Sequence, residues 1–241
     1  MPDLPIILSI IFLAMLVQST FSFGGALVAL PLLALFVEVK FATVLMTMLS
    51  ATIAIVIVIR NRRDIQIQAA WKLIVSAFVG IPFGILFLKN TDGSILKIVL
   101  AATVIVFTLL SLINLKSIRV ESPFAAYIFG LVSGVFGGAY NISGPPVVLY
   151  GSLANWDSHH FRATIQSYAL FTNVFAIIGH LIAGNIRLAE AKTYLWALPV
   201  VVLSIWLGTI IHNRIPSERY QIVVKILLLV LSARLLFSTI L

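Results

Sequence analysis

Residues 136–150, FGGAYNISGPPVVLY, interrupt an apolar region with three glycines, two adjacent prolines, an asparagine and a serine. An uninterrupted membrane helix would carry aliphatic residues here. In hydrocarbon an unpaired backbone N–H or C=O group costs several kcal/mol, so a non-helical stretch persists only inside protein or beside a water-filled cavity. The stretch therefore predicts a helix break at which the backbone meets something polar.

The remainder of the chain has the composition of a membrane protein. Of its 241 residues 61% are hydrophobic and 10% are charged, and the mean hydropathy is +1.13. No long polar stretch indicates a soluble domain, so residues 1–241 are expected to form a single membrane transport domain. A membrane helix needs about 20 apolar residues, and six runs meet this length: about 41–59, 69–88, 95–114, 162–183, 193–211 and 220–239.

Two further apolar regions, 4–37 and 123–154, are interrupted by glycine and proline, and each precedes three of the full spans. The first is expected to break at Phe23-Gly24-Gly25, and the second at Phe136-Gly137-Gly138 and again at Gly144-Pro145-Pro146. The matching arrangement predicts a duplication, with repeat 1 in residues 1–118 and repeat 2 in residues 119–241. Repeats with interrupted segments at corresponding positions are typical of secondary transporters, and the interruptions indicate the binding site.

The breaks have the chemistry of an anion site. Pro145 and Pro146 suit the first turn of a helix, and a helix that starts there directs its free N–H groups and positive dipole end at the break. The first half offers Ser22, Gly24 and Gly25 before a short segment from Ala26. Two facing helix starts would form one central pocket. The alternative is that the glycines only allow tight packing between membrane helices.

These features, with the Phe161-Arg162-Ala163-Thr164 opening of the next span, resemble the TauE/SafE family of sulfite and organosulfonate exporters. The resemblance extends over essentially the whole chain. It implies transport of sulfite or related sulfur-containing anions across a bacterial cytoplasmic membrane. Ala26 and Ala139 stand where a third glycine is common in the family, which leaves the substrate open.

The candidate substrate-binding residues lie at or beside the two breaks. Arg162 could hold a sulfonate with two hydrogen bonds or extend to the membrane interface, and Gln166 could face the pocket or bond a neighbouring helix. The full set is Ser22, Phe23, Gly24, Gly25, Gly137, Gly138, Tyr140, Asn141, Ser143, Gly144, Pro145, Arg162 and Gln166.

The acidic residues all fall in loops or at the ends of predicted helices. A buried carboxylate is the usual device for sodium or proton coupling, so this distribution favours a uniporter, or a carrier whose substrate brings its own proton. It also leaves no carboxylate pair for acid–base catalysis, and without cysteine there is no thiolate metal site. We therefore expect no enzymatic activity, no cofactor and no metal site.

The net charge of +8 comes from basic residues placed mostly between apolar runs, which does not indicate a nucleic-acid partner. The expected partners are a small anionic substrate and the lipid bilayer, and a homodimer is left open. If each broken region is a hairpin, the repeats are inverted and the basic residues divide nine inside to five outside. Single crossings would make the repeats parallel and the division eight to six, so the positive-inside rule favours inversion.

The sequence thus predicts an all-α polytopic membrane protein of two inverted repeats, each a broken, re-entrant helical hairpin followed by three transmembrane helices. The predicted function is export of a small sulfur-containing anion by alternating access around the breaks. A channel of the same architecture is one alternative. An intramembrane enzyme is another, but no cluster of catalytic side chains in the spans supports it.

Overall fold

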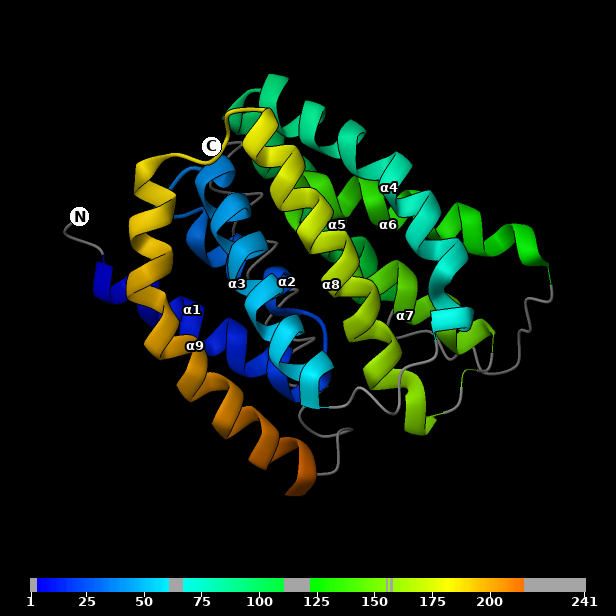
Figure 1. Ribbon diagram of the computed structural model, residues 1–241. Coiled ribbons are helices and arrows are strands. Elements are labelled where there is room, and N and C mark those ends of the chain that lie inside the picture. Colours follow the sequence, from blue (N-terminus) through cyan, green and yellow to red (C-terminus); the bar gives the residue numbers. More distant parts are fainter. Residues whose placement is uncertain (1–3, 61–66, 111–121, 155, 157, 215–241) are drawn as a thin grey trace.

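The computed structural model describes residues 4–60, 67–110, 122–154, 156 and 158–214. These residues fold into α-helices joined by short connections (Figure 1). The helices are α1 (Leu4–Phe21), α2 (Gly25–Leu33), α3 (Val39–Arg60), α4 (Ile67–Asn90), α5 (Gly93–Leu110), α6 (Pro123–Tyr140), α7 (Gly144–Leu153), α8 (Ser158–Ile182) and α9 (Leu188–Arg214).

Six of the described helices, α1, α3, α4, α5, α8 and α9, are long and apolar enough to cross a membrane. Five of them coincide with predicted spans, and α1 is the first part of the predicted broken region. The prediction of an all-helical polytopic membrane protein is confirmed. The predicted span at 220–239 lies outside the described residues.

Each of the two regions predicted to be broken contains one break. The first separates α1 from α2 at residues 22–24, and the second separates α6 from α7 at residues 141–143. The first residue of each break has a left-handed backbone: φ is 71° at Ser22 and 54° at Asn141. This conformation is unfavourable for residues other than glycine. The two broken regions therefore share one local design: a long helix, a left-handed residue, and a short helix that starts three residues after it.

The expected break at Phe136-Gly137-Gly138 is wrong, because these residues lie within the last turns of α6. The counterpart of Gly24-Gly25 at the start of α2 is Ser143-Gly144 at the start of α7, so the glycine pairs that match in sequence are not equivalent in structure. Gly138 instead lies against the backbone carbonyl of Ile81 in α4. Glycine there allows two helices to approach closely, as small residues do in membrane proteins.

The packing of the helices is related between the two halves. α4 of the first half lies along α6, the long hairpin helix of the second half, and α9 of the second half lies along α1, the long hairpin helix of the first (Figure 1). α3 and α8, which follow the two hairpins, contact each other. If the two halves are exchanged, the α4–α6 contact becomes the α9–α1 contact, and the α3–α8 contact becomes itself.

Contacts between residues fix the direction of each helix pair. Gly134 lies against Ala77, and Gly138 lies one turn further along both helices against Ile81, so α4 and α6 run parallel. Ser204 Oγ donates a hydrogen bond to the carbonyl of Phe12, and a Cβ at Gly208 would lie 3.2 Å from the carbonyl of Leu16. Each step again advances one turn in both helices, so α1 and α9 are also parallel.

The same reasoning connects α4 with α8. Leu73 packs in one cluster with Tyr168, and Gly179, three turns later in α8, lies against Ile85 of α4. These helices are therefore parallel, whereas α8 and α9 run in opposite directions from their short connection (Figure 1). It follows that α1, parallel to α9, points opposite to α6, which is parallel to α4 and α8.

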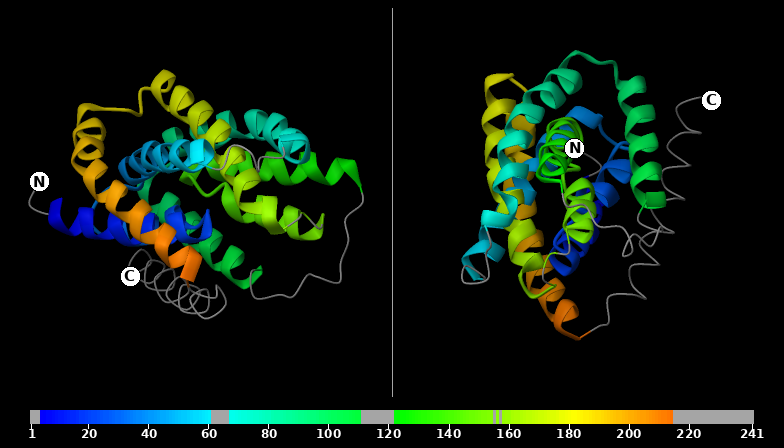
Figure 2. Two further views of the ribbon diagram at one scale, coloured as in Figure 1. Left: turned by 60° about the horizontal axis from the view of Figure 1, so that its bottom comes forward. Right: turned by 90° about the vertical axis from the view of Figure 1, so that its right-hand side faces the viewer.

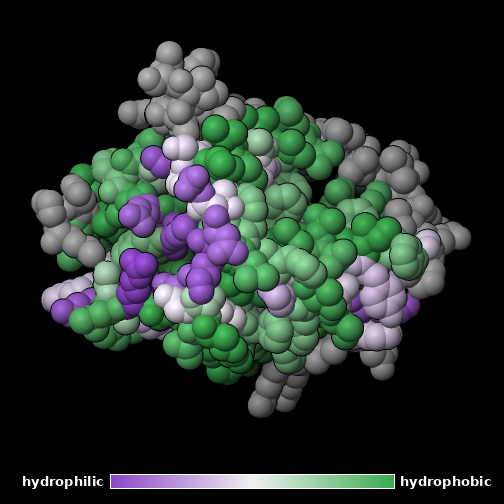
Figure 3. Space-filling view, turned by 90° about the horizontal axis from the view of Figure 1, so that it is seen from above, coloured by the Kyte–Doolittle hydropathy of each residue, from purple (hydrophilic) through white to green (hydrophobic). Residues whose placement is uncertain are grey.

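The connections α4–α5 and α8–α9 lie at one end of the bundle, where Lys40 Nζ donates to the carbonyl of Lys89 at 2.9 Å. Figure 3, which views this end, shows hydrophilic side chains gathered in one patch and hydrophobic side chains around it. In the right-hand view of Figure 2, α5 stands on the opposite side of the central hairpins from α8 and α9. The exposed sides of α4, α5 and α9 carry large apolar side chains, as expected of surfaces that face lipid.

Candidate functional site

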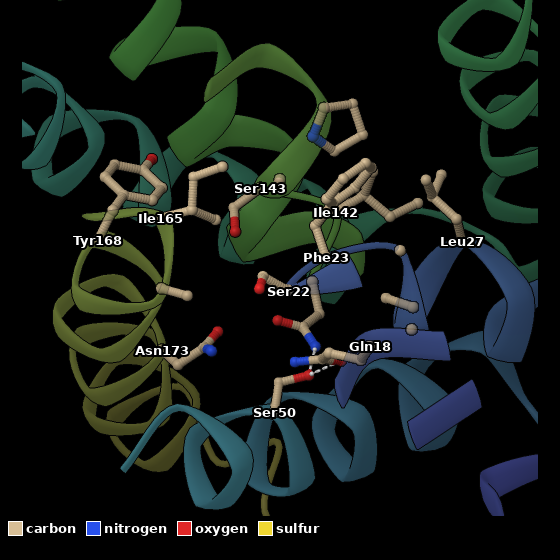
Figure 4. A pocket seen from close by; sticks show the side chains of 17 residues that line it. Gln18, Ser22, Phe23, Leu27, Ser50, Ile142, Ser143, Ile165, Tyr168 and Asn173 are labelled. Carbon is tan, nitrogen blue, oxygen red and sulfur yellow. Dashed lines mark hydrogen bonds between the residues drawn. The ribbon is translucent and has the colours of Figure 1, made fainter. Parts of the chain in front are cut away.

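A small cavity lies between the two breaks, in the middle of the bundle (Figure 4). It has a volume of about 30 Å³, and since one water needs about 10–15 Å³ on this scale, it accommodates about two water molecules. Both halves contribute to its lining: Gln18, Ser22, Phe23, Gly24, Gly25, Ala26, Leu27 and Ser50 come from the first, and Asn141, Ile142, Ser143, Gly144, Pro145, Ile165, Tyr168, Ala169 and Asn173 from the second.

Three side chains point into this cavity without a hydrogen-bond partner in the described structure. They are Ser22, Ser143 and Asn173, whose exposed fractions are 4%, 7% and 4%. Figure 4 shows the two hydroxyl groups and the amide directed at the common space. Their polar groups border the cavity, so a polar ligand or water in the cavity can complete their hydrogen bonds.

Two helix starts face the same space. The first backbone hydrogen bond of α2 is donated by the N–H group of Val28 to the carbonyl of Gly24, at 3.2 Å. The preceding N–H groups, beginning at Gly25, have no helical acceptor, as at any helix start. α7 begins at Gly144, but Pro145 and Pro146 supply no N–H group. The first half therefore offers mainly backbone donors, and the second half offers the Ser143 hydroxyl.

The carbonyl groups near the breaks are occupied by donors from neighbouring helices. Gln166 Nε2 of α8 donates to Ser22 O at 2.7 Å, and Ser133 Oγ of α6 donates to Ser143 O at 2.6 Å. Tyr168 Oη in turn donates to Ser133 Oγ at 2.6 Å. With these acceptors engaged, the cavity keeps the N–H groups at the start of α2, and the Ser22 and Ser143 hydroxyls and the Asn173 amide can also donate, so the lining can bind an anion.

The second break is held by a side-chain network from the first half. Asn141 Nδ2 donates to Ser50 Oγ at 2.8 Å, and Ser50 Oγ donates to Gln18 Oε1 at 3.1 Å. Gln18 also lies against the start of α2, where a Cβ at Gly25 would be 2.9 Å from Gln18 Cβ. Each break is thus bonded to the span that follows the hairpin of the opposite half: Ser22 to α8, and Asn141 to α3.

Most of the sequence-predicted residues meet at this cavity. Those that line it are Ser22, Phe23, Gly24, Gly25, Asn141, Ser143, Gly144 and Pro145. Gln166 does not line it, because its amide is used on the Ser22 carbonyl. The side chain of Arg162 lies outside the described residues.

Three other predicted residues face away from the cavity. A Cβ at Gly137 would lie 3.2 Å from Ser143 Cβ, so Gly137 gives the chain room to turn after α6. Gly138 faces α4. Tyr140 is buried and donates its hydroxyl to the carbonyl of Leu96 at 3.1 Å, which ties α6 to α5.

The sequence did not predict four of the residues that line the cavity: Gln18, Ser50, Tyr168 and Asn173. Ser50 and Asn173 are polar residues within predicted spans, but a polar residue there either faces a pocket or bonds a neighbouring helix, and the sequence does not distinguish these roles. The available signal is that polar residues within spans face the bundle interior or a cavity. The rotation of each helix about its own axis decides which of these polar side chains faces the cavity, and the structure gives that rotation.

The sequence profile of the family described as "Sulfite exporter TauE/SafE" matches residues 7–235, nearly the whole chain and both breaks. The chain belongs to the TauE/SafE family. No curated protein and no solved structure gives a match. As a member of a sulfite exporter family with six long apolar helices in its described part, this TauE/SafE protein is a multi-pass membrane transporter rather than an enzyme.

Proposed function

We propose that the protein exports small sulfur-containing anions, such as sulfite or organosulfonates, across the bacterial cytoplasmic membrane. The observation that carries this proposal is the cavity between the two breaks, at which two helix starts and the unpartnered Ser22, Ser143 and Asn173 side chains converge. Hydrogen-bond donors and positive helix ends attract anions. Family membership supports the sulfur-containing class.

Alternating access is the proposed mechanism. The opposite directions of α1 and α6 support two inverted repeats, each with a re-entrant hairpin, and in such transporters one repeat rocks against the other around a central site. The small cavity, formed by both halves, is the expected position of that site. A channel would need a continuous hydrated path, and a cavity of about 30 Å³ supports a carrier instead.

Transport of labelled sulfite into proteoliposomes tests the function. Purified protein should accelerate sulfite flux down its gradient over protein-free vesicles, and unlabelled ethanesulfonate should compete. A folded, reconstituted protein that moves neither anion would refute the proposal. A flux of thousands of ions per protein per millisecond would identify a channel.

Asn173→Leu is expected to reduce sulfite flux at least tenfold without destabilising the fold. Leucine has a similar size, and the Asn173 amide borders the cavity and makes no hydrogen bond to the described protein, so the melting temperature should stay close to that of wild type. Flux and thermal unfolding in detergent would be measured on the same preparation. Thr172→Val is the control, since the Thr172 hydroxyl bonds the carbonyl of Tyr168 within α8; it should retain flux. Equal flux through Asn173→Leu and Thr172→Val would show that Asn173 does not contribute to the site.

The inverted arrangement can be tested with single cysteines, because the chain has none of its own. Gly93 and Ala189 begin the helices that start at one end of the bundle, whereas Ser122 precedes α6 at the other. In intact cells a membrane-impermeant maleimide should label Gly93→Cys and Ala189→Cys, with Ser122→Cys labelled only after lysis. Labelling of Ala189→Cys and Ser122→Cys from the same side would contradict inversion.

A further inference from the structure

We infer that His180 forms a second anion-binding position, on a route that connects the central cavity with one end of the bundle. This inference rests on the proposed function, and it names a residue that the anion meets outside the cavity. His180 is fully buried in the last turn of α8, and its Nε2 atom has no hydrogen-bond partner in the described structure. Folded proteins rarely leave a buried polar atom unpaired, so Nε2 indicates a partner that binds at another stage of transport.

The other ring nitrogen decides what Nε2 can bind. Asn185 Nδ2 lies 3.1 Å from His180 Nδ1. An amide nitrogen donates and does not accept, so Nδ1 is the acceptor in this hydrogen bond. The neutral imidazole then carries its proton on Nε2. Nε2–H is therefore a buried donor without an acceptor, and an oxyanion supplies the acceptor that it lacks.

His180 lies on the face of α8 that borders the cavity. Gln166, Asn173 and His180 follow one another at intervals of seven residues, about two helical turns, and all three are buried. Asn173 lines the cavity, so His180 lies about 10 Å further along the same face. In α3, which contacts α8, about 15 Å of helix separates Ser50 at the cavity from Lys40 at the end of the bundle. His180 therefore lies between the cavity and that end.

The end of the bundle beyond His180 is basic. It contains the α4–α5 and α8–α9 connections and the hydrophilic patch of Figure 3. The described basic residues in or next to these connections and at the start of α3 are Lys40, Lys89, Lys97, Arg187 and Lys192, against the acidic Glu38, Asp92 and Glu190. An excess of positive charge at the mouth of a route raises the local concentration of anions.

The route is closed at His180 in this structure. Ile81 and Ile85 of α4 pack with Ala176 of α8 in one apolar cluster, and Gly179, the neighbour of His180, lies against Ile85. A carrier that works by alternating access keeps one side of its site closed at a time. Separation of α8 from α4 at this cluster would uncover Nε2–H to an anion that leaves Asn173.

His180→Gln and His180→Asn separate anion binding from a structural role. Glutamine keeps a donor near the position of Nε2, whereas asparagine keeps only an acceptor near the position of Nδ1, for the bond to Asn185. In proteoliposomes His180→Gln should keep at least one third of the wild-type sulfite flux, and His180→Asn at most one tenth. A structural role would favour His180→Asn. Equal flux through the two variants, or more through His180→Asn, would overturn the inference.

A cysteine at Ala176, between Asn173 and His180 on α8, tests the route with His180 intact. The anionic thiol reagent 2-sulfonatoethyl methanethiosulfonate should modify Ala176→Cys in proteoliposomes and stop sulfite flux, and ethanesulfonate should slow the modification. Leu181→Cys is the control, because Leu181 is 63% exposed on the apolar surface of α8, where lipid should protect it. An unmodified Ala176→Cys in protein that transports sulfite would overturn the route. If wild-type protein moves no sulfite, the proposed function itself fails.

Discussion

Gln166→Leu is expected to reduce anion flux at least tenfold and to lower the melting temperature. The added substitution Ser22→Gly is expected to restore part of the melting temperature but not the flux, because it removes a hydroxyl group that lines the cavity. Gln166 does not line the cavity; its amide donates to the carbonyl of Ser22, the left-handed residue of the first break. A non-glycine residue in this conformation is disfavoured by about 1–2 kcal/mol. Without the hydrogen bond the break relaxes, and the Ser22 hydroxyl and the start of α2 lose their positions.

Glycine at position 22 removes the strain that the bond opposes, because glycine adopts positive φ readily. The melting temperatures of wild type, both single variants and the double variant would form a double-mutant cycle, and flux would be measured on the same preparations. Ser167→Ala is the control on α8, since that hydroxyl bonds the carbonyl of Ala163 in its own helix. If Ser22→Gly gives no recovery of the melting temperature in the Gln166→Leu background, Gln166 does not act through the backbone of the break.

Gly144→Leu and Gly138→Leu are expected to fail in different ways. A Cβ at Gly144 would lie 2.8 Å from Phe23 Cβ, at the edge of the cavity. Leucine there must displace Phe23, and because Phe23 lines the cavity, the displacement should close the site and abolish flux while the protein remains folded. At Gly138 the added side chain meets the backbone of Ile81, which cannot move without moving α4. Overpacking of a tight interface typically costs about 1–3 kcal/mol and occasionally more, and here α4 must separate from α6.

Size-exclusion chromatography in detergent and proteoliposome flux distinguish the two outcomes. Gly144→Leu should elute as wild type and transport nothing, whereas Gly138→Leu should yield little monodisperse protein. Gly93→Leu is the control, because a Cβ there meets no atom within 4 Å. Wild-type flux by a folded Gly144→Leu protein would place the anion elsewhere. Well-folded Gly138→Leu protein would contradict the close packing of α4 on α6.

Hydropathy and glycine–proline chemistry were sufficient to predict the helices and the two regions that are broken, but not which residues form the second break. In a bilayer a long apolar segment satisfies its backbone hydrogen bonds by forming a helix, and Pro145 marks the start of a helix. The same chemistry could not distinguish Gly138 from Gly144, because glycine serves both close helix packing and an open backbone. Only the tertiary structure shows that one faces Ile81 and the other faces Phe23.

The side chains from the spans were harder to predict than the breaks. Gln18, Ser50 and Asn173 are separated from the second break by distance along the chain, and their roles depend on how each helix is rotated. Gln166 was predicted as a site residue, yet its contact is with the backbone carbonyl of Ser22. Which contact a long amide makes depends on distances of a few ångströms between helices of different repeats, which a single sequence does not specify.

The hydrogen bonds between repeats have a consequence for biosynthesis. Gln166 follows Ser22 by 144 positions, so the first break finds its partner only after α8 of the second half has left the ribosome. Ser50, the partner of the second break, precedes Asn141 by 91 positions and is already in place. Until then the first hairpin has to wait in the membrane with a polar carbonyl uncovered, which is costly in lipid. Insertion of this protein is therefore expected to end with a late assembly step, in which α8 docks and sets the geometry of both halves at once.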